Sequence, residues 1–318
     1  MSTIHTFTLT DHEQVVNRVK QLHHRSDEIK SKVGFVLKQL WNPERELGAI
    51  QNIGIFDELI KRFPNFREAI EYFEGNAIAL NQLDMPFEAN PVLLIGDPGI
   101  GKTLFVSELA KLMGLPFFEI SMNTMSASFA LTGGNLQWGD ATVGFIAKSL
   151  SESLKGNPII MIDEIDKNNG GSTYNPINSL YGLLEPHSAK RFKDEALEVE
   201  IDASKIIWVL TGNYAENIPE PILSRMRVIN INQPTDSDMP DVIKSIYTKI
   251  RNDKAYGQVI DTSIDEEIIN TLKDLSPRAI RMTLEAAVLR AIIDRRSTIN
   301  SSDLKFTKKE KHHAIGFI

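Results

Sequence analysis

Short apolar runs alternate with helical stretches through the middle of the chain. Near-continuous apolar strands separated by helices are typical of a parallel sheet that is covered on both faces. Ligands of such sheets bind beyond the carboxyl ends of the strands, so we expect functional side chains directly after each run. The pattern predicts an α/β fold with a parallel five-stranded sheet flanked by helices. The five runs span residues 92–95, 117–120, 159–162, 206–210 and 228–231.

Helical spacing prevails on both sides of this region. Near the amino end, Val15, Val19 and Leu22 recur at helical spacing after residues 10–13, Thr-Asp-His-Glu, which have the form of a capping box. A second helix is expected after Asn65. Beyond the last run, apolar positions within 239–250, 264–275 and 280–292 predict three amphipathic helices. The expected organisation is an N-terminal helical region (1–88), a large α/β domain (89–233), a helical domain (234–310) and a C-terminal tail (311–318).

Composition narrows the class of protein. The chain has 318 residues, of which 42% are hydrophobic and 24% charged, as in ordinary soluble domains. The absence of cysteine excludes disulfides, cysteine nucleophiles and cysteine-based zinc sites. No secretory signal and no apolar stretch near the ~20 residues of a membrane helix are present, so we expect a cytoplasmic protein without a membrane partner. The net charge of -7 weighs against a dedicated nucleic-acid binder, although a local basic groove can coexist with it.

A phosphate-binding loop follows the first apolar run. Residues 96–103 match the pattern G-x-x-x-x-G-K-[ST] between a strand and a helix. Its glycines let backbone N–H groups converge on phosphates, and the helix N-terminus adds partial positive charge. Lys102 is expected to reach the β- and γ-phosphates and Thr103 to ligate Mg²⁺. The strand–loop–helix context disfavours an accidental glycine-rich turn. The predicted nucleotide-contacting residues of the loop are Gly96, Asp97, Pro98, Gly99, Ile100, Gly101, Lys102, Thr103 and Leu104.

Two further runs end in polar residues that complement this loop. Asp163 and Glu164 follow the third run; Asp163 would hold Mg²⁺ through its water shell, and Glu164 would polarise the attacking water. An acidic pair after a strand often only begins a helix, but the upstream phosphate loop favours catalysis. Asn213 follows the fourth run and could orient the water or touch the γ-phosphate. A turn-forming asparagine is the alternative.

Together these motifs resemble those of AAA+ ATPases, and more narrowly the ATPase module of Lon proteases. The resemblance covers about residues 90–300 and also rests on residues 218–226 and on the stretch 175–223, which includes Leu-Leu-Glu-Pro at 183–186. It implies ATP and Mg²⁺ as ligands, ATP hydrolysis, a homo-oligomer that is a hexameric ring, and a helical lid domain. It makes Asp163 and Glu164 the Walker B pair and Asn213 the first sensor.

The resemblance also assigns roles to arginines. Arg225 matches the arginine finger that reaches the γ-phosphate of a neighbouring subunit, and such a cation is worth ~10³–10⁵ in rate. Arg227 is its competitor, and a plain surface arginine is the alternative for either. Arg278, after Ser276 and a first-turn proline, matches the second sensor, and Arg281 could share or replace that role.

Residues 133–140 occupy the place of the family's substrate-gripping pore loop. Lon-type loops place an aromatic, an aliphatic and a glycine consecutively, whereas here Trp138 directly precedes Gly139. Trp138 could therefore grip an extended polypeptide or simply pack its loop. Residues 308–318 are basic and then apolar, and they would dock on the protein itself or on a partner.

The expected function is that of an oligomeric ATP-driven protein remodeller or unfoldase. Lon proteases continue into a serine–lysine protease domain, whereas this sequence ends at Ile318, so we expect no protease activity. A nucleic-acid motor or loader on the same ATPase core is the less favoured alternative, and would show strong salt dependence. A nucleotide-gated regulatory module is the third possibility. No adenine-contacting residue stands out in the sequence.

Overall fold

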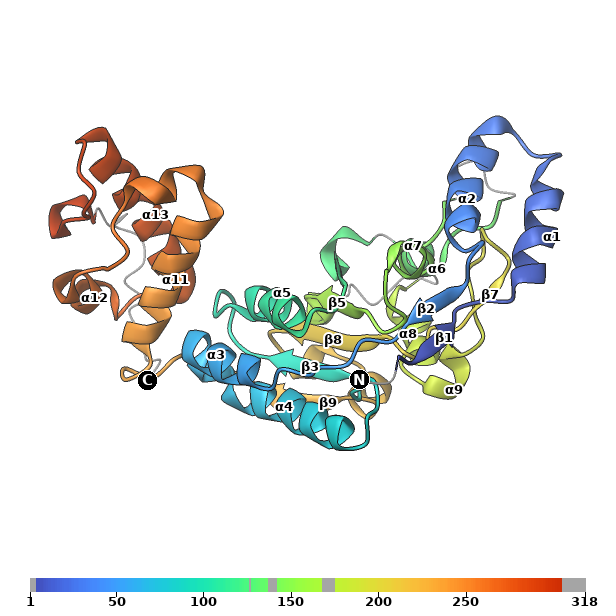
Figure 1. Ribbon diagram of the computed structural model, residues 1–318, viewed down its shortest axis with the longest axis horizontal. Helices are drawn as coiled ribbons and strands as arrows, with labels where there is room; N and C mark the ends of the chain where they lie inside the picture. The colour runs from blue at the N-terminus through green and yellow to red at the C-terminus, as the bar shows by residue number, and fades with distance from the viewer. Residues whose placement is uncertain (1–3, 126, 137–141, 168–174, 305–318) are drawn as a thin grey trace, which may run out of the picture. The chain divides into compact units, whose positions relative to one another are not determined.

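The structure is a computed structural model that describes residues 4–125, 127–136, 142–167 and 175–304 (Figure 1). These residues divide into two compact units. The larger contains residues up to 60, 66–97 and 102–232, and the smaller contains 61–65, 98–101 and the residues from 233 onward. Across the described residues, every helix is too short or too polar to cross a membrane.

A five-stranded parallel sheet lies at the centre of the larger unit, which confirms the predicted fold class. Its middle strands β5, β8 and β3 are buried almost throughout, so the sequence shows them as uninterrupted apolar runs. The edge strands β4 and β9 are partly exposed. In spatial order the strands are β4 (Phe117–Ser121), β5 (Ile159–Asp163), β8 (Ile207–Gly212), β3 (Val92–Ile95) and β9 (Arg227–Asn230).

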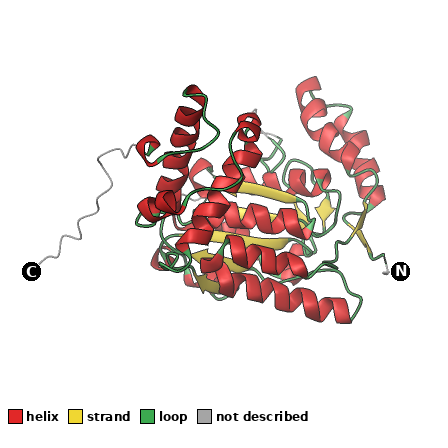
Figure 2. Cartoon of the chain, turned by 60° about the vertical axis from the view of Figure 1, so that its left-hand side comes forward, coloured by secondary structure: helices red, strands yellow, loops and turns green. Residues whose placement is uncertain are grey.

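Helices cover both faces of this sheet, and Figure 2 shows them in front of and behind the strands. On one face, α5 (Lys102–Met113) packs against β4, β5 and β8, and the ring of Phe105 stacks on Phe66 at 4.4 Å between centroids. Phe66 precedes α4 (Arg67–Gln82), the helix predicted after Asn65. On the other face, alternate strand residues join a core with α7 (Phe145–Glu152) and α8 (Ile177–Leu183).

The N-terminal region shares that second core. Its helices α1 (His12–Leu22) and α2 (Asp27–Gln39) contribute buried residues to this core, and α3 (Gly54–Arg62) and α4 complete the helices of the region. Leu9, Val15, Val33 and Leu37 are fully buried in the same cluster as residues of the central strands. Asn157 reinforces the connection, since its buried side chain accepts from Gly48 N at 2.7 Å and donates to the carbonyls of Gly48 and Phe87 at 2.9 and 2.8 Å.

Two details of this region differ from the sequence pattern. The carboxylate of Asp11, and not the side chain of Thr10, caps α1 by accepting from Gln14 N at 3.1 Å. Thr10 instead donates to the Glu200 carbonyl at 2.6 Å and forms a bridge with Ile201, so the expected capping box is absent there. An antiparallel pair, β1 (Thr6–Thr8) and β2 (Glu44–Glu46), also lies in this part, which was expected to be helical.

Short elements connect the strands of the larger unit. Helix α9 begins directly after Glu185, and α10 precedes Arg225. These elements are α6 (Phe129–Thr132), α9 (Pro186–Ala189), β6 (Phe192–Lys193), β7 (Glu200–Ile201) and α10 (Glu220–Leu223).

The smaller unit is helical, as predicted. Its helices α11 (Met239–Asp253), α12 (Glu266–Leu272) and α13 (Pro277–Ile293) enclose an apolar core of their own. The Ser276 hydroxyl caps α13 by accepting from Ala279 N at 3.3 Å, and proline occupies the first turn.

Candidate nucleotide site

The predicted phosphate loop joins the carboxyl end of β3 to the start of α5. Gly99 and Gly101 have φ angles of 82° and 101°, a region that side-chain-bearing residues enter only with strain. These two positions therefore need glycine, which lets the backbone turn from the sheet edge into the helix.

Lys102, the first residue of α5, is buried with only 8% of its surface exposed. Its ammonium group donates to the carbonyls of Gly96 and Asp97 at 2.6 and 3.1 Å and to Asn213 Oδ1 at 2.9 Å. Burial lowers the pKa of Lys102, and nearby carboxylates, foremost Asp163, oppose the shift. An anionic partner would stabilise this buried ammonium group, which is now held by neutral oxygens. Charge-assisted hydrogen bonds are about twice as strong as those between neutral groups. The site therefore fits a phosphate.

The two predicted Mg²⁺ ligands lie side by side. Thr103 Oγ1 donates to Asp163 Oδ2 at 2.9 Å, so the start of α5 and the end of β5 meet there. The hydroxyl of Thr211, at the end of β8, donates to the other carboxylate oxygen of Asp163. A hydroxyl and a carboxylate oxygen suit Mg²⁺, which binds few protein ligands and keeps several waters. Sequence reasoning missed Thr211, although its place at the end of a buried strand was a usable signal.

Glu164 has an unusual backbone. Its φ of 56° lies in the left-handed region, which costs a non-glycine residue ~1–3 kcal/mol and is common at functional sites. Its N–H donates to Asp163 Oδ1 at 3.0 Å and to Thr211 Oγ1 at 3.2 Å. Its carboxylate accepts a hydrogen bond from the side-chain amide of Asn123. Asn123 lies just beyond β4 and was also missed, although polar residues were expected after each strand.

Arg225 and Arg227 lie at the opposite edge of the sheet from this loop. Strands β3 and β9 run parallel with Val92 opposite Arg227, whereas the loop follows Ile95 at the other end. Four strand residues at ~3.3 Å each separate the two edges by about 13 Å. Arg225 Nε lies 2.8 Å from Glu185 Oε1. Arg227 is half exposed and its guanidinium lies over the Tyr72 ring, 4.7 Å from the centroid.

Comparison with known proteins agrees with this geometry. Residues 92–233 match the family model "ATPase family associated with various cellular activities (AAA)". These residues are similar to the AAA domains of that family. The chain is 30% identical over 195 residues to the mitochondrial Lon protease homolog of Ostreococcus lucimarinus. The aligned residues make up 61% of this chain and 21% of the relative. It is 27% identical over 290 residues to Lon protease 2 of Borreliella burgdorferi, covering 88% and 36%. The resemblance to AAA+ and Lon ATPase modules is confirmed.

The chain thus spans about a fifth to a third of the length of these relatives. Among solved structures, a mutant of RuvB from Thermotoga maritima is similar with a TM-score of 0.50 and 15% identity, covering 74% of this chain and 67% of that one. At that identity the likeness shows the fold alone.

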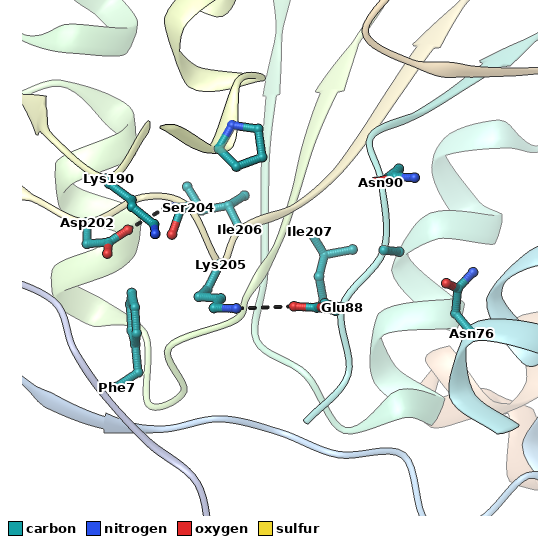
Figure 3. Close-up of a pocket in the computed structure, with 12 residues that line it drawn as sticks. Phe7, Asn76, Glu88, Asn90, Lys190, Asp202, Ser204, Lys205, Ile206 and Ile207 are labelled. Atoms are coloured by element: carbon teal, nitrogen blue, oxygen red, sulfur yellow. Dashed lines mark hydrogen bonds and ion pairs between the residues drawn. The ribbon is translucent and has the colours of Figure 1, made fainter. Parts of the chain in front are cut away.

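A cavity of about 550 Å³ lies in the larger unit, away from the phosphate loop (Figure 3). Its walls include Asn90 and Ile206, which precede β3 and β8 and therefore mark the amino edge of the sheet. Lys205 and Glu88 face each other across it as an ion pair at 3.1 Å. Ligands of parallel sheets bind at the carboxyl edge, so we do not assign the nucleotide to this cavity.

The remaining predicted residues lie elsewhere. Arg278 and Arg281 belong to the first turns of α13 in the smaller unit, where Arg281 Nε pairs with Glu285 at 3.1 Å. The sensor role of Arg278 stays a prediction. Trp138 and the tail from residue 305 lie outside the described residues.

Proposed function

We propose that this AAA ATPase works as a homo-oligomeric ring that remodels or unfolds protein substrates. The supporting observation is that Lys102, Glu164 and their neighbours lie at one edge of the sheet, whereas Arg225 lies at the other. One subunit then carries a phosphate site and, at a distance, a cation suited to a second subunit's site. The resemblance to Lon ATPase modules supports a hexamer.

Hydrolysis at this site uses the chain's own residues as follows. The loop N–H groups and Lys102 would hold the β- and γ-phosphates of ATP, and Thr103 and Asp163 would hold Mg²⁺, which would neutralise phosphate charge. The oxygen of the attacking water bonds to the γ-phosphorus, and the bond between the γ-phosphorus and the ADP oxygen breaks. Glu164 accepts a proton from this water. Asn213, bonded to Lys102, orients the water or the γ-phosphate.

A subunit-mixing experiment tests the ring. Glu164→Gln abolishes hydrolysis at a subunit's own site but keeps the arginine that it offers to its neighbour. Arg225→Ala removes that arginine but keeps the subunit's own site intact. After random mixing in equal amounts, half of the sites keep Glu164 and half of those receive an intact arginine, so about one quarter of the wild-type rate per subunit returns. Arg227→Ala is the matched control and keeps the wild-type rate. A mixture as inactive as its components would refute the trans role of Arg225.

The substrate is tested separately. Trp138→Ala should stop ATP-driven unfolding of a tagged test protein while ATP hydrolysis continues. Unfolding at the wild-type rate would show that Trp138 does not grip. We also propose that this chain cleaves no peptide bonds itself, and intact test protein after prolonged incubation with ATP would support this. Stimulation of hydrolysis by DNA with a steep salt dependence would favour a nucleic-acid motor instead. The cytoplasmic location and the sensor role of Arg278 stay predictions.

A further inference from the structure

The side chain of Arg225 is held by residues of its own subunit. Its Nε lies 2.8 Å from Glu185 Oε1, and its guanidinium carbon lies 5.9 Å from the centroid of the Tyr181 ring. One terminal nitrogen, Nη1, donates to the Pro221 carbonyl. The other, Nη2, has no assigned contact with any residue that the structure describes. The guanidinium is therefore fixed along one side and keeps donors for another anion.

Three parts of the chain converge on this arginine. Tyr181 comes from α8, Glu185 directly precedes α9, and Pro221 lies in α10, which packs against α8. The Arg225 and Glu185 side chains are 28% and 46% exposed, so both lie at the surface and the pair reaches solvent. An isolated pair of that exposure contributes little to stability, typically ~0–1 kcal/mol. Its more informative property is orientation, because a carboxylate and an aromatic face together restrict a flexible side chain.

We propose that Glu185, assisted by Tyr181, is a positioning residue that holds Arg225 ready for the ATP site of the neighbouring subunit. This rests on the proposed trans role of Arg225. Glu185 touches no phosphate in its own subunit and acts by restricting Arg225 before the neighbour arrives. Misplacing a catalytic group by about 1 Å costs up to ~10²-fold in rate, whereas removing an arginine finger costs ~10³–10⁵-fold.

The variant Glu185→Ala tests this. We expect kcat for ATP to fall about ten- to a hundredfold, while the Kd of a fluorescent ATP analogue changes less than about twofold. Glu185→Gln keeps the size and polarity of the side chain beside Arg225 and removes only its charge, so it should lose less. Glu68→Ala is the matched control, because Glu68 pairs with Arg227 at 3.8 Å and is similarly exposed. It should keep the wild-type kcat.

Mixing separates positioning from a local structural role. Glu185→Ala subunits keep an intact phosphate site, so adding Glu164→Gln subunits, which carry a well-held Arg225, should restore about one quarter of the wild-type rate. No restoration would show that Glu185 acts on its own site or on folding, and an increased rate for Glu185→Ala alone would show that it restrains Arg225. Either result overturns the proposal. If Glu185→Ala does not assemble, Glu185→Gln takes its place in the mixture.

The two proposals fail in different ways. If Arg225→Ala subunits also gain no activity from Glu164→Gln subunits, the trans arginine itself is wrong. If Arg225→Ala subunits recover and Glu185→Ala subunits do not, the ring stands and the positioning role falls.

Discussion

Gly133 occupies a backbone position that no other residue should tolerate. It has φ 80° and ψ 163°, a region that is essentially restricted to glycine. A Cβ atom at this residue would lie 2.5 and 2.6 Å from the two carboxylate oxygens of Asp194. Asp194 is fully buried and accepts hydrogen bonds from the N–H groups of Gly144, Ala196 and Leu197 at 2.8, 2.9 and 3.0 Å. We call Gly133, Gly144 and Asp194 the clasp.

The cost of Gly133→Ala has two parts. The backbone strain of a non-glycine residue in this region is ~1–3 kcal/mol. Moving Asp194 aside leaves buried N–H groups unpaired at ~1–3 kcal/mol each, and at least one bond must be lost. A total of about 2–6 kcal/mol is a large part of the 5–15 kcal/mol typical of a folded domain.

Urea denaturation followed by circular dichroism measures this cost. Gly75→Ala is the matched control, because Gly75 lies inside α4 and an added Cβ there meets no atom within 4 Å. The control should be stabilised by about 0.5–1 kcal/mol through helix propensity. If the free energy of unfolding of Gly133→Ala lies within ~0.5 kcal/mol of the wild-type value, the account of the clasp is wrong. Surface substitutions without such contacts already produce changes of that size.

Three further predictions concern the same unit. Burial raises the pKa of Asp194 from 3.8 to about 6, against the backbone hydrogen bonds that lower it. Asp194 therefore binds its proton more tightly in the folded state than in the unfolded state. The stability that this proton contributes is lost as pH rises, by about 1.3 kcal/mol between pH 5 and 7. Asp194→Asn lacks the dependence, so the stability difference between wild type and variant in urea should shrink over that interval; a constant difference would contradict the shift. Asn123→Ala releases the Glu164 carboxylate and should raise basal phosphate release severalfold, and an unchanged or lower rate would show that the amide does not restrain it. Thr211→Val removes the hydroxyl that orients Asp163, and the Mg²⁺ concentration for half-maximal hydrolysis should rise about tenfold, since outer-shell partners of metal ligands are worth 10–100-fold; an unmoved Mg²⁺ titration would count against it.

The sequence predicted the sheet because burial on both faces leaves a direct trace in composition. The middle strands β5, β8 and β3 contain apolar residues at nearly every position, and their ends point to Lys102, Asp163 and Glu164. Strands β1 and β2 have three residues each and are mostly exposed, so no apolar pattern marks them.

Side-chain partners were harder to foresee because they join distant parts of the chain. Asn123 meets Glu164 across 41 positions, and Thr211 meets Asp163 across 48. Glu185 likewise meets Arg225 from a distant part of the chain, where α10 packs against α8. Such contacts follow from the strand order β4-β5-β8-β3-β9, which apolar periodicity does not specify.

The segment that matches the AAA family model is shorter than the segment that folds together with it. The AAA match begins at residue 92, yet Leu9, Val15, Val33 and Leu37 are fully buried in the same apolar cluster as residues of β5 and β8, and α2 packs against α7. Burying each such side chain contributes ~1.5–3 kcal/mol. A fragment trimmed to the family match would expose the apolar residues of this cluster that pack against α2, including those of α7, and is expected to aggregate. A stable minimal fragment of this chain must therefore include the N-terminal helices α1 and α2.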